Sequence, residues 1–164
     1  MTDNSNAMIR DCDPGRDRNG LVSCIVEMQD FERSIEPLLP AGVDMADPYV
    51  ELLLNRCSGA SGRVFIAEAK QTVVGFVGVI ARVEPDEPDE EATPFTYISD
   101  LVVLPAYRRR GIGTALLRRA EAYARERGMT LLRINVLAKN EVAGQLYRTL
   151  GFSDYRIQLL KRLG

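Results

Sequence analysis

The stretch Asp100-Leu-Val-Val-Leu-Pro-Ala-Tyr-Arg-Arg-Arg-Gly-Ile-Gly-Thr114 decides how this sequence folds. A strand-like apolar run ends at its proline, an arginine-rich turn follows, and Gly111 and Gly113 lead directly into a helical pattern. Glycines at such a junction expose consecutive backbone N–H groups at the positive end of a helix dipole, and these attract an anion, usually a phosphate. The stretch therefore predicts a phosphate-binding loop, and the three arginines add positive charge beside it.

Two common phosphate-binding motifs do not fit this stretch. A dinucleotide-binding fingerprint needs a third glycine, and Leu116 stands in its place. A P-loop needs the string GxxxxGK[ST], which the sequence does not contain. The spacing that remains is [QR]-x-x-G-x-[GA], filled by Arg108, Gly111 and Gly113.

This spacing, in its context, resembles the acetyl-CoA-binding loop of the GNAT superfamily, the GCN5-related N-acetyltransferases. A second cluster supports the resemblance, because Asn140-Glu-Val-Ala143 and Leu146-Tyr-Arg-Thr-Leu-Gly-Phe152 match the family pattern N-x-x-A-x-x-L-Y-x-x-L-G-F. Together the two clusters cover about residues 97–154. The resemblance implies direct transfer of an acetyl group from acetyl-CoA to a primary amine in a ternary complex, with no metal ion.

The resemblance also implies roles for individual residues. Tyr147 would be the general acid near the thioester sulfur, with a core aromatic as the alternative interpretation. Asn140 would contact the cofactor, although it can also simply cap its helix. The residues expected to bind the cofactor are Leu101, Val102, Val103, Arg108, Arg109, Arg110, Gly111, Ile112, Gly113, Thr114, Asn140, Ala143 and Tyr147.

The sequence offers several candidates for the general base. Family members commonly use a carboxylate in the strand before the loop, and Asp100 is the only carboxylate there. A glutamate found further upstream in other members is replaced here by Tyr97 or Ser99. A structural role for Asp100 therefore stays open, with Glu27, Asp30 and Glu84 as other candidate bases.

The composition agrees with this chemistry. Histidine is absent from the 164 residues, which excludes Ser-His and Cys-His nucleophiles, His-ligated metals and imidazole proton shuttles. The 21 basic and 23 acidic residues leave a net charge of −2, which argues against a nucleic-acid partner. Cys12, Cys24 and Cys57 lack metal-ligand spacing, so we expect reduced thiols in the cytoplasm. No segment has the apolar length of a membrane span, so we expect no membrane partner.

Hydrophobic periodicity predicts the order of the elements. We expect strands near 8–10, 64–69, 72–80, 95–103, 131–137 and 152–163, and helices near 16–34, 47–57, 112–127 and 140–150. Residues 1–7 are polar and are expected to form a flexible tail before one domain over 8–164. The prediction is an α/β fold, GNAT-like, with a mixed, mostly antiparallel central sheet flanked by helices.

The sequence does not identify the amine that accepts the acetyl group. Acidic residues gather in the first two helices and their connection (Glu27, Asp30, Glu32 and Glu36) and in residues 84–91. Such an acidic rim favours a cationic small-molecule amine or a protein amine. A solvated loop is the alternative interpretation of 84–91. A non-catalytic acyl-CoA-binding regulatory domain is the alternative function, and the resemblance also allows a homodimer.

Overall fold

Five strands form one sheet whose spatial order follows the chain in the computed structural model, which describes residues 7–164. β1 to β4 pair antiparallel and β5 joins β4 in parallel, which confirms the predicted mixed sheet. The strands are β1 (Met8–Asp11), β2 (Gly62–Ala69), β3 (Thr72–Val83), β4 (Phe95–Val103) and β5 (Leu132–Ile134).

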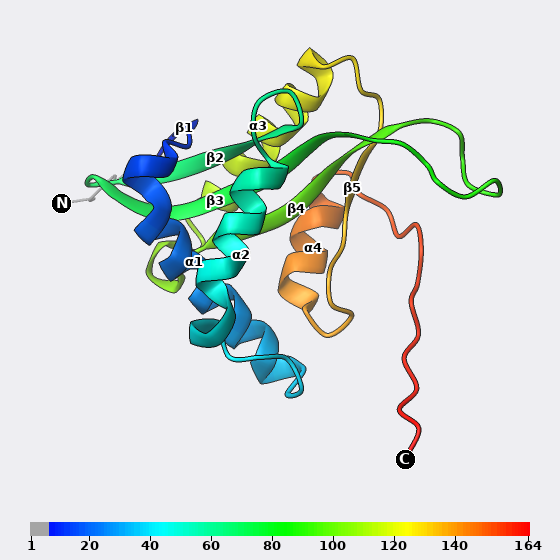
Figure 1. Ribbon diagram of the computed structural model, residues 1–164, viewed down its shortest axis with the longest axis horizontal. Coiled ribbons are helices and arrows are strands. Elements are labelled where there is room, and N and C mark those ends of the chain that lie inside the picture. The colour runs from blue at the N-terminus through cyan, green and yellow to red at the C-terminus, as the bar shows by residue number, and fades with distance from the viewer. Residues whose placement is uncertain (1–6) are drawn as a thin grey trace.

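Helices cover both faces of the sheet (Figure 1). α1 (Pro14–Ile35) and α2 (Gly42–Arg56) bury one apolar cluster against it, and α3 (Ile112–Glu126) and α4 (Glu141–Thr149) bury another on the opposite face. The apolar stripe of α3 is buried as its spacing predicts, from Ile112 to Tyr123. None of the helices within residues 7–164 is long and apolar enough to cross a membrane.

Two helices begin earlier than their sequence patterns suggest. α1 begins at Pro14 because proline suits a first helical position and the Asp13 side chain accepts the N–H of Gly15 at 3.0 Å. α2 begins at Gly42, whose N–H donates to the Asp30 carboxylate at 2.7 Å. A Cβ at Gly42 would lie 2.6 Å from the Val26 carbonyl oxygen, so only glycine lets the two helices approach this closely.

β4 carries a bulge at Ser99, and its pairing with β5 stops there. Gly78 of β3 pairs with Asp100 and the next residue of β3 pairs with Ile98, so Ser99 is the extra residue. A Cβ at Gly78 would lie 2.6 Å from Ser99 Oγ, so this glycine makes room for the bulge, as its place in the strand suggests. β5 pairs with β4 only over residues 96–98, which leaves the rest of this β4 edge open.

Two strand predictions are wrong at the C-terminal end. The strand expected over 131–137 covers only Leu132–Ile134, because its pairing with β4 stops before the bulge at Ser99. The segment expected as an edge strand over 152–163 has no partner strand and no regular structure. Ala7 is half-buried against the core, and the other six residues of the expected tail lie outside the described residues.

Candidate active site

The loop between β4 and α3 has the backbone geometry of an anion site. A single 3-10 turn, η1 (Pro105–Tyr107), follows β4, and Arg109 and Gly111 then take left-handed conformations with φ of 62° and 78°. α3 starts at once, and no side chain caps its first N–H groups. These N–H groups therefore point out of the helix end, where a phosphate can accept them.

Two of the three arginines brace this loop. Arg108 Nε donates to the Val103 carbonyl at 2.9 Å, and its guanidinium lies 5.8 Å from the ring centre of Phe31 on α1. Arg110 Nη2 donates to the Ala106 carbonyl at 3.0 Å. Arg109 is exposed at the left-handed position. The structure thus places Arg108 and Arg110 as supports of the loop, while Arg109 extends beside it.

Along the open edge of β4, every second residue directs its backbone N–H and C=O groups outward. Leu104 N–H donates to the Val74 carbonyl of β3, so in this ladder Val102 also directs its backbone groups towards β3. Leu101 and Val103 direct theirs to the open edge. The side chain of Val102 is 4% exposed in the core beneath α1 and α2. Among the three predicted residues of β4, Val102 therefore has a packing role.

Most other predicted cofactor residues gather at the starts of α3 and α4. Gly113 and Thr114 lie in the first turn of α3, and Ile112 there is 5% exposed in the core. Asn140 Oδ1 accepts the Ala143 N–H at 3.2 Å, so Asn140 does cap α4. Its amide nitrogen makes no hydrogen bond within residues 7–164, which leaves this donor available to a ligand.

Tyr147 lies on the inner side of α4. It is 8% exposed, and its ring packs against Phe152 with centres 5.9 Å apart. Burial, with the nearby carboxylates of Glu32 and Asp100, raises the pKa of Tyr147 to about 12. The phenol is therefore protonated near neutral pH and has a proton to donate.

Asp100 points from β4 towards the helices of the opposite face. It is 5% exposed, and the Tyr49 hydroxyl of α2 donates to its Oδ1 at 2.7 Å. The second oxygen, Oδ2, is buried and has no hydrogen-bond partner within residues 7–164. Burial raises the pKa of this carboxyl, and the Tyr49 bond partly opposes the rise. An unsatisfied buried oxygen of this kind is able to accept a proton or an N–H group.

Two residues of this cluster were not predicted as catalytic or cofactor-binding residues, although Glu32 belongs to the expected acidic rim. Burial and the neighbouring Asp100 raise the pKa of the Glu32 carboxyl, which places Glu32 of α1 near the strand carboxylate. Tyr49 lies in α2, within the helix expected near 47–57, and its hydroxyl reaches the site through the Asp100 hydrogen bond. One signal was available, because Glu32 continues the apolar stripe of Ile25 and Met28 at helical spacing.

The other candidate bases have different surroundings. Glu27 is exposed on α1, Asp30 accepts the Gly42 N–H, and Glu84 pairs with Arg82 at 2.5 Å beyond β3. Two members of the acidic rim are also paired, Glu36 with Lys139 at 2.9 Å and Glu90 with Arg156 at 2.5 Å. Asp100 and Glu32 are therefore the carboxylates that the fold brings near Tyr147.

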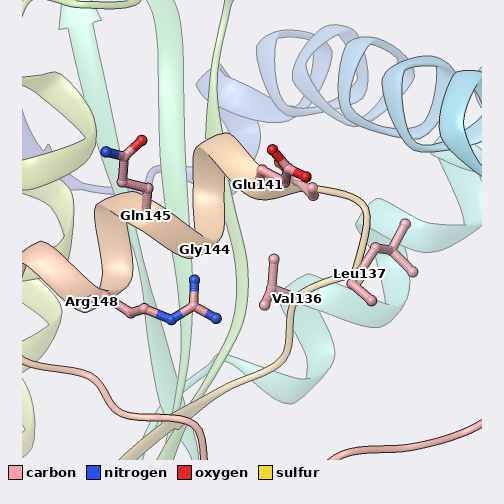
Figure 2. A pocket seen from close by; sticks show the side chains of 8 residues that line it. Val136, Leu137, Glu141, Gly144, Gln145 and Arg148 are labelled. Carbon is pink, nitrogen blue, oxygen red and sulfur yellow. The ribbon is translucent and has the colours of Figure 1, made fainter.

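A cavity of about 430 Å³ lies on the other side of α4 (Figure 2). Its walls are the connection from β5 to α4 and the helix face that carries Glu141, Gly144, Gln145 and Arg148. Asn140 also lines this cavity, whereas Tyr147 does not.

Comparison with known proteins agrees with this geometry. An uncharacterized N-acetyltransferase of Methanocaldococcus jannaschii is 34% identical over 97 residues, which are 57% of this chain and 40% of that protein. Aminoglycoside N(6')-acetyltransferase type 1 of Acinetobacter haemolyticus is 33% identical over 64 residues, 39% of this chain and 44% of that protein. The chain thus spans less than half the length of these two curated relatives.

Solved protein structures share this fold. The structure of aminoglycoside N-acetyltransferase AAC(6')-Iy in complex with CoA superposes with a TM-score of 0.71 at 17% identity, covering 99% of this chain and 98% of that one. The sequence model of the acetyltransferase (GNAT) family matches residues 27–152, which include α2, the whole β2–β4 meander, the β4–α3 loop and α4. The chain therefore belongs to the acetyltransferase (GNAT) family.

Proposed function

We propose that this chain is an N-acetyltransferase that transfers the acetyl group of acetyl-CoA directly to a primary amine. One observation carries the proposal: Tyr147 and Asp100 of β4, both nearly buried, lie close enough that the Asp100 carboxylate raises the pKa of Tyr147, and β4 has an open edge that ends at the uncapped start of α3. A thioester held along the edge, with its phosphates at the helix start, would therefore lie between a proton donor and a proton acceptor.

The residues present fit acetyl-CoA as co-substrate. The N–H groups from Gly111 to Thr114 suit its pyrophosphate, and the exposed Arg109 adds positive charge. The outward-facing backbone groups of Leu101 and the side-chain amide of Asn140 can form hydrogen bonds with the pantetheine arm of the coenzyme, which contains amide groups. When bound, acetyl-CoA supplies the activated acetyl group. The residues of the chain orient the two substrates and transfer the protons.

The surroundings of Asp100 and Tyr147 decide which of them accepts a proton and which donates one. Asp100 takes a proton from the incoming ammonium, directly or through water, since its raised pKa makes it a better base than an exposed carboxylate. Tyr147 stays neutral and donates its phenolic proton to the departing thiolate, whose ordinary pKa is about 8.5. Neither step needs an imidazole, which the sequence lacks.

The acceptor that this site favours is a small cationic amine. Asp100 and Glu32 place two carboxyl groups beside Tyr147 with no basic side chain ion-paired to either among the described residues. The relative from Acinetobacter haemolyticus is named for an aminoglycoside, a small molecule with several amines, and this supports the same acceptor class here. A reducing compartment such as the cytoplasm fits the free Cys12, Cys24 and Cys57.

The test is an amine panel. Purified protein, acetyl-CoA and one amine at a time (an aminoglycoside, a polyamine, a lysine peptide) are combined, free thiol is followed, and products are identified by mass spectrometry. We expect thiol release and a product heavier by one acetyl group with at least one small polycation. Tight acetyl-CoA binding without turnover on any amine would instead favour a non-catalytic acyl-CoA-binding domain.

A further inference from the structure

The bulge at Ser99 turns the side chain of Asp100 to the face of the sheet that α1 and α2 cover. Ile98 packs in the apolar cluster beneath α3 and α4, whereas Val102 packs in the cluster beneath α1 and α2. Residues four apart in a regular strand share a face, so the extra residue reverses the alternation between these two. Asp100, two residues before Val102, therefore lies beneath α2 and within reach of its side chains.

Tyr49 of α2 fixes one oxygen of this carboxylate. Its hydroxyl donates to Asp100 Oδ1 at 2.7 Å, a distance typical of a hydrogen bond to an ionised acceptor. The helix that carries the donor is itself firmly placed, because Val50 and Leu53 of α2 are 0% and 2% exposed in the core. The bond therefore restricts the rotation of the Asp100 carboxylate.

The second oxygen of Asp100 faces a space that glycine keeps open. Asp100 Oδ2 and Ser99 Oγ are both buried, and neither has a hydrogen-bond partner within residues 7–164. A Cβ at Gly78 of β3 would lie 3.4 Å from Oδ2 and 2.6 Å from Ser99 Oγ, so only glycine leaves room beside both atoms. A buried carboxylate oxygen without a partner is costly, so Oδ2 is the oxygen that gains most from receiving a proton.

Titratable groups from four elements face Asp100. Burial raises the pKa of the Asp100 carboxyl, and the Tyr49 hydroxyl opposes this rise more than the nearby Ser99 or the charge of Arg56 does. The charge of Asp100 acts in turn on its neighbours and adds to the effect of burial in raising their pKa values. These neighbours are Glu32 of α1, Tyr49 and Cys57 of α2, Tyr97 of β4 and Tyr147 of α4. Among the groups that favour the ionised carboxylate, Tyr49 therefore contributes most.

We propose that Tyr49 is a positioning residue for acetyl transfer: its hydroxyl holds Asp100 through Oδ1 and keeps Oδ2 as the oxygen that takes the proton of the acceptor amine. This inference rests on the proposed function, in which Asp100 is the base. In the step concerned, an N–H bond of the ammonium breaks and its proton moves to Oδ2, directly or through water. The electron pair stays on the nitrogen, which then attacks the thioester carbonyl, and Tyr49 keeps its own proton throughout.

The first experiment follows the titration of Asp100 directly, by NMR of protein labelled with carbon-13 at the aspartate carboxyl groups. The Asp100 signal is the one that the variant Asp100→Asn lacks. Tyr49→Phe removes one oxygen and keeps the ring, and we expect it to raise the pKa of Asp100 by about 1 unit, because the ionised form loses a hydrogen bond. Tyr97→Phe is the matched control. Tyr97 is also half-buried and faces Asp100 without a hydrogen bond to it within the described residues, so its loss should move the pKa by less than about 0.3 unit.

The second experiment measures rates with an amine that the panel shows to be acetylated. In Tyr49→Phe the rise of kcat/KM with pH should move to higher pH by the same amount as the titration of Asp100. The plateau of kcat should fall about 3- to 10-fold, because the carboxylate is free to rotate, and the Kd of acetyl-CoA should stay near wild type. When Asp100→Asn is already present, Tyr49→Phe should change kcat less than about 2-fold, since Tyr49 acts through this carboxylate.

Two results would overturn the proposal: an Asp100 titration that is the same in Tyr49→Phe and wild type, or a full further loss of kcat when Tyr49→Phe is added to Asp100→Asn. The NMR titration does not need turnover. If the wild type acetylates no amine of the panel, the proposed function fails, whereas a raised Asp100 pKa in Tyr49→Phe still supports the contact through which Tyr49 holds the carboxylate. Unfolding curves like that of the wild type show that each variant is folded.

Discussion

The two sides of the candidate active site are built in different ways. The cofactor side is local in sequence: β4, the arginine turn and the start of α3 follow one another, and backbone N–H groups carry the binding. The acceptor side joins Glu32 of α1, Tyr49 of α2 and Asp100 of β4, which are far apart in the chain. The first side has a sequence motif because its geometry is set by glycines and turns. The second depends on packing, so the acceptor can change while the fold stays the same.

Asp100→Asn should show the largest effect and tests the acceptor side alone. We expect kcat to fall at least about 100-fold, the size typical of a lost general base, while the Kd of acetyl-CoA stays near wild type. In the wild type, kcat/KM should rise as pH increases through the raised pKa of Asp100, because the carboxyl accepts a proton only after losing its own. The variant should lose this rise. Asp30→Asn is the control, and an unchanged pH profile in the Asp100 variant would move the base elsewhere.

The same substitution should also stabilise the protein at alkaline pH. The pKa of Asp100 is higher in the folded than in the unfolded chain, so the folded state binds more protons between the two values and wild-type stability falls as pH rises through this window. Asparagine does not ionise and can still accept the Tyr49 bond. We expect the Tm of Asp100→Asn at pH 8 to exceed that of wild type by about 2–5 °C, as measured by calorimetry. A lower Tm would indicate that Asp100 is a structural carboxylate.

Tyr147→Phe should have the next largest effect, at the boundary of the two sides. We expect kcat to fall about 10- to 100-fold with little change in acetyl-CoA affinity, because only the phenolic proton is lost. A pKa of about 12 also predicts that wild-type activity shows no alkaline fall from this group below about pH 10. Rates of the variant equal to wild type across the pH range would remove the general-acid role.

Gly111→Ala tests the cofactor side and has a matched control at the other end of α3. Gly111 and Gly128 both have left-handed backbones, with φ of 78° and 72°, and a Cβ would meet nothing at either. Each alanine should cost about 1–2 kcal/mol of stability. Only Gly111→Ala should also weaken acetyl-CoA binding, by about 5- to 20-fold in calorimetric titration, because it redirects the N–H groups of the loop. Equal affinity in both variants would place the phosphates elsewhere.

Glu32→Gln should give the smallest effect and tests whether α1 helps to hold the acceptor. We expect the KM of a polyamine or aminoglycoside to rise about 3- to 10-fold with kcat nearly unchanged, since one carboxylate of the acceptor side is neutralised. Glu27→Gln, on an exposed turn of the same helix, should leave KM as it is. An equal rise of KM in both variants would indicate that the overall negative charge of α1 attracts the acceptor, and that Glu32 makes no specific contact with it.

The sequence alone determined the local features of this protein. The glycine turn before α3, the capping Asn140, the stripe of α3 and the meander of β2, β3 and β4 are all recognisable because turn chemistry and hydrophobic period act over a few residues. The absence of histidine in the same way restricts proton transfer to other groups.

Only the tertiary structure decided the rest. Packing buried Asp100 against Tyr49, brought Glu32 to the same place, and engaged Arg108 with Val103 instead of leaving it beside the loop. Neighbouring strands also decided where β5 ends and left residues 153–164 without a partner strand. Strand pairing and the pKa of a buried carboxyl depend on what lies across from a residue in space, and a linear pattern does not contain that information.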